Sequence, residues 1–189
     1  MTNKLENFLK NSNLSQESIT IICDSWSKEI IIKKKDYLLR RDQKENYLYF
    51  IISGCIALVI ESENKNSVLG FGYDNSIITS FISFSTETPS ELSLLGVSES
   101  KVLKISKTEL NKLINSHPEI AKWYYTFIEK TLIGHLNRQV ELTTLSPKER
   151  YKLFIERSGH LINSIPLKYI SSYLNMTPET LSRVRTLIS

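Results

Sequence analysis

The polar side chains near the end of the chain have the types and the spacing that could hydrogen-bond to nucleic acid. Glu179 and Arg183 are four residues apart, so on a helix they share one face, with Ser182 beside them. A guanidinium can donate to O6 and N7 of guanine, and a carboxylate can accept from the amine of cytosine. We therefore expect Glu179, Ser182 and Arg183 to contact DNA bases.

Three further side chains in this region suit phosphate groups. Lys168, Thr177 and Thr180 can donate to phosphate oxygens, which sets the register of a protein on DNA without reading sequence. Residues 146–189 hold 7 Lys and Arg against 3 Asp and Glu, whereas residues 1–145 hold 17 of each. This basic segment predicts an anionic partner, although charge alone fits a solvated surface helix equally well.

Two short helices joined by a tight turn must hold these side chains. A first helix over 166–173 would point Ile170 and Leu174 to a core, and Asn175 suits the left-handed conformation of a turn. Thr177 is then the N-cap of a second helix and Pro178 its first residue. The buried face of that helix would consist of Leu181, Val184 and Ile188. The pattern predicts a helix-turn-helix, and a helical hairpin that only caps the fold is the alternative.

The middle of the chain has the pattern of strands. Short apolar runs rich in Ile, Val, Tyr and Phe alternate with turn-forming residues. The runs are 30–32, 37–39, 47–52, 56–60, 68–71, 77–82, 92–97 and 102–105. Many short strands at close spacing indicate a sandwich or barrel rather than a parallel sheet. The residues before them have helical spacing, with Ser15 as the cap of a second short helix.

A long helix is predicted over 118–143, about 39 Å at 1.5 Å per residue. Its apolar stripe consists of Ile120, Tyr124, Phe127, Thr131, Leu132, His135, Leu136 and Val140. The helix is longer than one face of a small β domain requires, so pairing with a second copy is favoured over packing on the chain's own strands. The predicted dimer contacts are Ile120, Tyr124, Phe127, Thr131, Leu132 and His135.

Capping boxes mark two helix starts and support a three-part organisation. In both, a serine precedes a glutamate by three residues: Ser106 with Glu109, and Ser146 with Glu149. Gly159 is expected to end the second of these helices. The predicted fold class is α+β, with a jelly-roll-like antiparallel β-roll and N-terminal helices over 1–116, a dimerisation helix over 117–145 and an all-α helix-turn-helix domain over 146–189.

Several classes of protein do not fit. The N-terminus carries charge where a signal peptide would be apolar, and no apolar run is long enough to cross a bilayer, so we expect a cytoplasmic protein without membrane contact. Cys23 and Cys55 are too few for a four-thiolate cluster. His117, His135 and His160 lie outside the strands, so no metal and no cofactor are expected. Phosphate-loop and nucleophile-elbow motifs are absent, which argues against an enzyme.

The chain resembles the Crp/Fnr family of bacterial transcription regulators over nearly its whole length. The stretch 48–54, LYFIISG, followed by 55–60 resembles the central hairpin of the family's β-roll, with Gly54 at the turn, and 33–43 resembles the entry to the roll. The ending, 165–183, resembles the DNA-reading unit. The resemblance implies a cyclic-nucleotide-binding-like sensory β-roll, base contacts at Glu179 and Arg183, and phosphate contacts at Lys168, Thr177 and Thr180.

The sequence departs from the family members that bind cyclic AMP. Those members carry a Gly-Glu pair and, about ten residues later, an Arg that pairs the cyclic phosphate. Here no glycine precedes a glutamate, and no arginine lies between Arg41 and Arg138. The corresponding stretch, 77–93, is rich in hydroxyls instead: Thr79, Ser80, Ser83, Ser85, Thr86, Thr88, Ser90 and Ser93. We interpret these hydroxyls as a solvated surface rather than the wall of an effector pocket, and expect no cyclic-nucleotide binding by the usual route.

The DNA-reading unit departs from the family as well. Pro178 stands where the family has a further base-contacting side chain, and the family's C-terminal hairpin does not follow the second helix within the 189 residues. The sequence predicts a homodimeric regulator that binds an inverted repeat of double-stranded DNA. An effector is unknown. The alternative is a small-molecule-binding module whose C-terminal helices dock on a protein.

Overall fold

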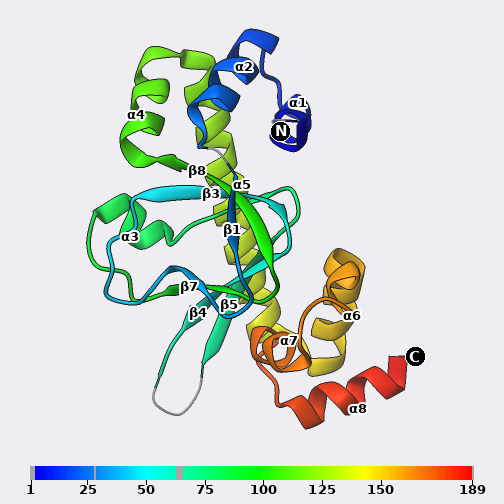
Figure 1. The fold of residues 1–189 in the computed structure, drawn as a ribbon. Coiled ribbons are helices and arrows are strands. Elements are labelled where there is room, and N and C mark those ends of the chain that lie inside the picture. Colours follow the sequence, from blue (N-terminus) through cyan, green and yellow to red (C-terminus); the bar gives the residue numbers. More distant parts are fainter. Residues whose placement is uncertain (1–2, 28, 63–65, 189) are drawn as a thin grey trace.

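Three structural units follow one another from one end of the molecule to the other (Figure 1). The computed structural model describes residues 3–27, 29–62 and 66–188. A helical cap lies at one end, a β-roll forms the middle, and four short helical segments form the other end. The long helix α5 (Pro118–Thr144) runs along the roll and joins the two ends. In the part of the chain that is described, no helix is long and apolar enough to span a membrane.

The helical cap consists of α1 (Asn3–Lys10), α2 (Gln16–Ser25) and α4 (Lys107–Ser116). Helices α2 and α4 pack on the start of α5, and α1 packs on α2. The Ser15 side chain accepts from the backbone N–H of Ser18, which confirms the predicted cap of α2. The carboxylate of Glu119 then binds the Ser15 N–H at 2.8 Å and the Ser15 hydroxyl at 2.6 Å. The first turn of α5 is therefore tied to the first turn of α2.

Two four-stranded antiparallel sheets form the β-roll. One has the strand order β1-β8-β3-β6 and the other β2-β7-β4-β5. The strands are β1 (Ile30–Ile32), β2 (Tyr37–Leu39), β3 (Tyr47–Ser53), β4 (Cys55–Ile60), β5 (Ser67–Tyr73), β6 (Ser76–Ile78), β7 (Ser93–Gly96) and β8 (Ser100–Ser106). Seven of the eight apolar runs that predicted a strand coincide with one of them, and the eighth, 77–82, does so only at its start. The predicted antiparallel β-roll is confirmed.

Gly54 links β3 to β4 as expected. Its φ is 97°, and a Cβ at this position would lie 2.3 Å from the carbonyl oxygen of Glu99. Both observations require glycine at the turn.

The run 77–82 was predicted as one strand, and this is wrong for its second half. Strand β6 ends at Ile78, and a short helix, α3 (Phe81–Thr86), begins three residues later. The backbone N–H of Phe84 donates to the carbonyl of Ser80, which closes the first turn of α3. A short apolar run has too few residues to show whether its period is that of a strand or of a helix.

Helix α5 has two different faces, and the predicted apolar stripe is divided between them. Ile120 is fully buried against the cap helices of its own chain, so it cannot contact a partner. Tyr124, Phe127 and Thr131 are half-buried, and the Phe127 ring lies 6.1 Å from that of Phe81 in the roll. The exposed apolar side chains are Tyr125, Leu132, Ile133, Leu136 and Val140.

The C-terminal helices share a core with the β-roll. They are α6 (Pro147–Ser158), the 3₁₀ segment η1 (Gly159–Leu161), α7 (Leu167–Tyr173) and α8 (Pro178–Ile188). Apolar side chains of α6, α7 and α8 pack together with those of β4, β5 and β7. The Ser172 hydroxyl accepts from the N–H of Val68 at 3.0 Å and donates to the carbonyl of Asn66. Helix α7 therefore lies directly on strand β5.

The helix boundaries at α6 follow the sequence signals. Ser146 and Glu149 form both hydrogen bonds of a capping box, as predicted. Gly159 is the C-cap, but its φ of −58° is an ordinary helical value, because the chain continues into η1 rather than reversing in a left-handed turn. At the start of α4, Ser106 caps the N–H of Glu109, while the Glu109 carboxylate binds Lys112.

Candidate nucleic-acid interface

Helices α7 and α8 are joined by a turn of four residues, as the sequence predicts. Asn175 has a φ of 50°, which is the left-handed conformation expected for it. The Thr177 hydroxyl accepts from the N–H of Thr180 at 3.2 Å, so Thr177 caps α8 and Pro178 is its first residue. Ile170 and Leu174 are buried in the core shared with the roll. The two helices form the arrangement of a helix-turn-helix.

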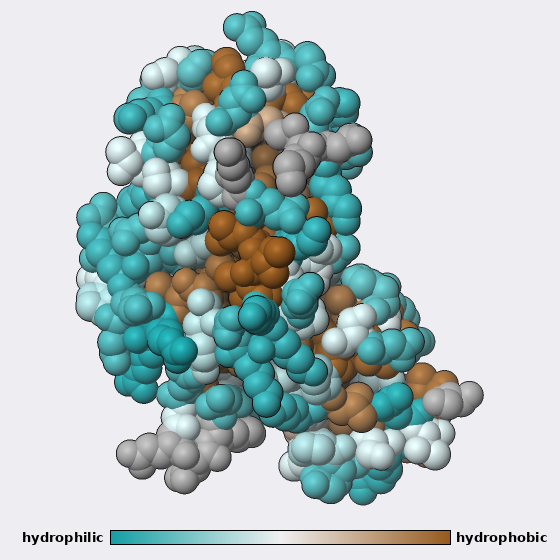
Figure 2. All heavy atoms as spheres, in the orientation of Figure 1, coloured by the Kyte–Doolittle hydropathy of each residue, from teal (hydrophilic) through white to brown (hydrophobic). Residues whose placement is uncertain are grey.

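The buried face of α8 is shorter than predicted. Leu181 and Val184 are buried, but the side chain of Ile188 is 38% exposed and its neighbour Leu187 is more exposed still. Helices α6 and α7 cover only the first two turns of α8, so the predicted burial of Ile188 is wrong. The surface over α8, at the lower edge of Figure 2, is mainly hydrophilic.

The three side chains expected to contact bases are exposed on α8. Glu179, Ser182 and Arg183 all lie at the surface, away from the face formed by Leu181 and Val184. None of the residues that the structure describes forms a salt bridge with the Arg183 guanidinium. A hydrogen bond with the Thr177 side chain lowers the pKa of Glu179, so this carboxylate is ionised at neutral pH. These side chains are available to an external partner.

The side chains expected to contact phosphate differ in their availability. Lys168 is exposed, and its ammonium lies 5.0 Å from the centre of the Tyr169 ring. The hydroxyls of Thr177 and Thr180 bond to each other at 3.2 Å, at the first turn of α8. Their first role is local, because they satisfy the free N–H groups of the helix start.

Arg150 connects the helix-turn-helix to α5. The sequence identified it only as one of the basic residues in 146–189. Its side chain is 8% exposed. One guanidinium nitrogen donates to the carbonyl of Leu145 at 2.8 Å, and the other donates to the carbonyl of Asn175 at 3.3 Å. The end of α5 is thereby joined to the turn between α7 and α8.

A second set of charged groups makes a parallel connection. Glu141 on α5 accepts from Arg138 at 3.0 Å and from Arg157 of α6 at 2.8 Å. Burial opposes ionisation of Glu141, but the hydrogen bonds from Arg157 and Arg138 lower its pKa. Arg138 also donates to the carbonyl of Tyr173, the last residue of α7. Two of the seven basic residues in 146–189, Arg150 and Arg157, therefore hold the unit in place. The only hint of this structural role in the sequence is that the chain has several arginines after residue 137 and none in the 96 residues before Arg138.

The prediction that the hydroxyl-rich stretch 77–93 is a solvated surface is wrong for most of it. Thr79, Ser80, Ser83, Ser90 and Ser93 are buried, and only Ser85, Thr86 and Thr88 are exposed. The buried hydroxyls bond to one another and to the backbone, for example Ser80 to Ser90 at 2.8 Å and Thr79 to the carbonyl of Tyr47 at 2.8 Å. Buried hydroxyls of this kind have their partners inside the chain.

A buried carboxyl lies next to this hydroxyl network. Glu45 is 1% exposed, and its Oε1 accepts from the N–H of Tyr47 at 3.0 Å and from the Tyr49 hydroxyl at 3.3 Å. Its Oε2 is buried with no hydrogen-bond partner among the described residues. Burial raises the pKa of Glu45 to about 7, against the lowering effect of its hydrogen bonds, of which the one from the Tyr47 N–H is the largest. Sequence reasoning overlooked Glu45 because nothing in its neighbours marks it as buried.

The comparisons with known proteins agree with this architecture. Residues 29–117 match the cyclic nucleotide-binding domain family. FixK2 from Bradyrhizobium japonicum has a similar structure, with a TM-score of 0.76 and 15% identity, over 85% of this chain and 83% of that one. The c-di-GMP-responsive global regulator CLP from Xanthomonas campestris gives 0.67 at 16% identity, over 92% and 91% of the two chains.

A third similar structure is the catabolite activator protein of Thermus thermophilus, with a TM-score of 0.59 and 16% identity over 96% of this chain and 85% of that one. No curated protein sequence matches the chain. The alignments with CLP and with the Thermus protein each cover more than nine-tenths of this chain, so the similarity extends well beyond the β-roll. Residues 29–117 thus match the cyclic nucleotide-binding domain family, within a chain that has the fold of the Crp/Fnr regulators.

Proposed function

We propose that the protein is a transcription regulator that binds double-stranded DNA through α8. The observation that carries the proposal is the exposure of Glu179, Ser182 and Arg183 on the outer face of a capped helix whose other face is packed in a core. An α-helix fits the major groove, where these side chains reach base edges. Lys168, Thr177 and Thr180 would then contact phosphates. Such a regulator works in the cytoplasm, where the DNA is.

The proposal includes a homodimer formed along α5. The exposed apolar residues Tyr125, Leu132, Leu136 and Val140 are spaced by seven, four and four residues, which is close to the repeat of a coiled-coil seam. The side chain of Leu136 is 57% exposed in the single chain. Pairing along this seam would remove these side chains from water and set two α8 helices to read an inverted repeat.

Cyclic AMP is not part of the proposed mechanism. The buried hydroxyls of 77–93 form internal hydrogen bonds, and no arginine lies in this stretch to pair a cyclic phosphate. A phosphate held without a charged partner would be bound weakly.

Selection of binding sites from a randomised DNA duplex pool, with and without cyclic AMP, tests the proposal. We expect an inverted-repeat consensus without ligand. Replacing Arg183 with Ala should weaken binding to the selected site by about 1–3 kcal/mol and change binding to random DNA little, because base contacts add specificity. The matched control is Lys152→Ala, an exposed basic residue on α6. Equal losses on both DNAs would rule out base reading.

The dimer has its own test. Leu136→Asp should convert the protein to a monomer in sedimentation equilibrium and abolish binding to the full inverted repeat, because a charge would lie in the seam. Asn137→Asp introduces the same charge at the neighbouring exposed position and should leave the dimer intact. A Leu136→Asp variant that remains dimeric would contradict pairing along α5.

The alternative function is a regulatory module whose C-terminal helices dock on a protein. Salt dependence distinguishes the two, since phosphate contacts release counterions and binding therefore weakens steeply with added salt.

A further inference from the structure

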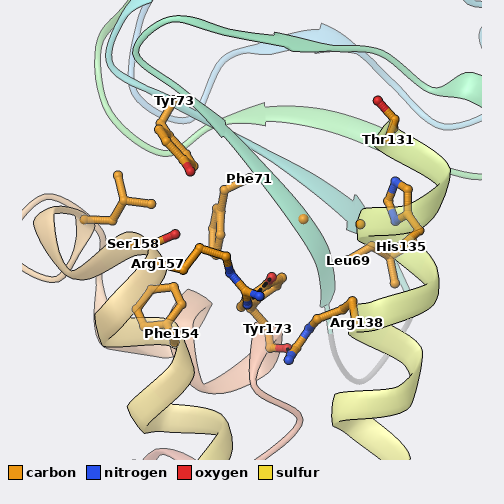
Figure 3. A pocket seen from close by; sticks show the side chains of 13 residues that line it. Leu69, Phe71, Tyr73, Thr131, His135, Arg138, Phe154, Arg157, Ser158 and Tyr173 are labelled. Carbon is orange, nitrogen blue, oxygen red and sulfur yellow. Dashed lines mark hydrogen bonds between the residues drawn. The ribbon is translucent and has the colours of Figure 1, made fainter. Parts of the chain in front are cut away.

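A cavity of about 280 Å³ lies where the β-roll, α5 and the C-terminal helices meet (Figure 3). Strand β5 contributes Leu69, Gly70, Phe71 and Tyr73 to its wall, and α5 contributes Thr131, Gly134, His135 and Arg138. Helices α6 and α7 complete it. None of its lining residues comes from 77–93, the stretch that corresponds to the cyclic-phosphate site of the family. The cavity is therefore separate from that site.

Two glycines in the wall keep this space open. Gly70 lies inside a strand and Gly134 inside a helix, where glycine is less favourable than alanine. Neither has a positive φ, and a Cβ at either position would meet no heavy atom within 4 Å. Backbone conformation and close packing, the usual reasons for glycine, are both absent here. By contrast, a Cβ at Gly72 would lie 2.6 Å from the Ile51 side chain.

Gly134 does not face the proposed dimer seam. At about 100° per residue, it lies within about 40° of Arg138 around the helix and about 150° from the middle of the exposed apolar stripe. The side of α5 that carries Gly134 faces β5 and α6, because residues of all three elements line the same cavity. Room for a partner's backbone therefore does not explain this glycine.

The chemistry of the wall is aromatic on one side and cationic on the other. The Phe71 and Tyr173 rings lie 5.3 Å apart, and the Phe154 and Tyr173 rings 5.9 Å apart. The guanidiniums of Arg138 and Arg157 point toward these rings from α5 and α6 (Figure 3). Both pair with the single carboxylate of Glu141, so two positive charges face one negative charge. Flat apolar walls and an excess positive charge suit a flat organic anion.

We propose that this cavity binds a small aromatic acid, with its carboxylate on Arg157 and Arg138 and its ring against Phe71 and Tyr173. The volume corresponds to about nine water molecules and lies just below the range of about 300–1,000 Å³ typical of ligand sites, which limits the ligand to one or two rings. A ligand here contacts the roll, α5 and α6 together. It would therefore control the position of α8, a consequence that rests on the proposed function.

Calorimetric titration of the full chain with 1-naphthoate and with benzoate, in the absence of DNA, tests the site. We expect 1-naphthoate to bind at least tenfold more tightly than the uncharged 1-naphthylmethanol. Gly134→Leu, which fills the cavity, and Arg157→Gln, which removes its more exposed cation, should each weaken 1-naphthoate binding at least tenfold. Lys152→Gln removes a charge from the same helix outside the cavity and should have no effect.

Two results would overturn the site. One is the absence of binding of either acid by the unmodified protein at millimolar concentration. The other is equal binding of 1-naphthoate by the unmodified protein and Gly134→Leu, since the acid would then bind elsewhere, for example on the apolar stripe of α5. Because this assay contains no DNA, its outcome is independent of DNA binding. The affinity for DNA, measured separately, should change at least threefold when 1-naphthoate is added. An unchanged affinity would overturn only the claim that the ligand controls the position of α8.

Discussion

The two hydroxyl-rich parts of the chain, 77–93 in the β-roll and 165–189 at its end, use similar residues in opposite ways. In the β-roll, Ser80, Ser83 and Ser90 are buried, and their hydroxyls bond to the chain itself. In α8, Ser182 and Thr186 are exposed, and the core of the helix is formed by Leu181 and Val184. The two parts have similar compositions. They differ in the hydrogen-bond partners of their hydroxyls, which lie within the chain in the β-roll, whereas those of α8 are exposed to solvent.

This contrast separates residues that hold the fold from residues that are free to bind. A buried polar group is costly without a partner, so the chain must supply that partner. An exposed polar group is satisfied by water and can exchange it for a ligand at little cost. The charged residues of the C-terminal unit divide in the same way, with Arg150 inside and Arg183 outside.

The largest effect on stability is expected for Arg150→Met. The substitution leaves the carbonyls of Leu145 and Asn175 without their buried donor, so the free energy of unfolding should fall by about 3 kcal/mol. Urea denaturation measures it. Lys152→Met, exposed on the same helix, should change stability by less than about 0.5 kcal/mol. Similar values for the two variants would mean that the division between inner and outer basic residues is wrong.

The buried carboxyl of Glu45 predicts a pH dependence of the β-roll. Its pKa is about 7 in the folded protein and 4.5 without burial, so between these values the folded state binds more protons than the unfolded state. The contribution of Glu45 to the free energy of unfolding is fully present below about pH 4.5 and is lost as the pH rises to about 7. The loss amounts to about 3 kcal/mol.

Glu45→Gln tests this dependence. The variant should be more stable than the unmodified protein at pH 8, and this gain should shrink as the pH falls to 5, measured by urea denaturation at each pH. Comparing the two proteins at the same pH removes the contribution of the other carboxyls. Glu91→Gln, on the exposed side of the same region, should show no such trend. A pH-independent difference for Glu45→Gln would show that Glu45 is ionised in the folded state.

A smaller effect is expected for Ser83→Ala. The Ser83 hydroxyl accepts from the N–H of Glu45 at 2.9 Å and donates to the carbonyl of Thr88 at 2.5 Å. Its removal leaves a buried N–H unsatisfied and should lower the free energy of unfolding by about 1–2 kcal/mol. Ser85→Ala, two residues away and exposed, is the control and should have almost no effect. If both substitutions are neutral, the hydroxyls of 77–93 are available to a ligand after all.

Local signals in the sequence were sufficient for most of the elements. Strands β1 and β2 have the predicted bounds, the caps at Ser15, Ser146 and Thr177 are present, and α5 ends within one residue of its predicted end. Each of these features depends on residues that are close in sequence, such as a side chain and an N–H three residues later. The exposure of Glu179 and Arg183 follows for the same reason, because helical spacing decides which residues share a face.

Side-chain burial between distant segments was decided only by the tertiary structure. The sequence placed the hydroxyls of 77–93 on the surface and counted Arg150 and Arg157 among the charges free for a partner. Packing instead buries five of these hydroxyls and Arg150, and Arg157 is paired with Glu141 of α5. The division of the α5 stripe into an inner and an outer face depends in the same way on α2, α4 and β5. Periodicity reports the geometry of one element, but burial depends on which elements meet, and the cavity beside Gly70 and Gly134 exists only where a strand of the roll, α5 and the C-terminal helices come together.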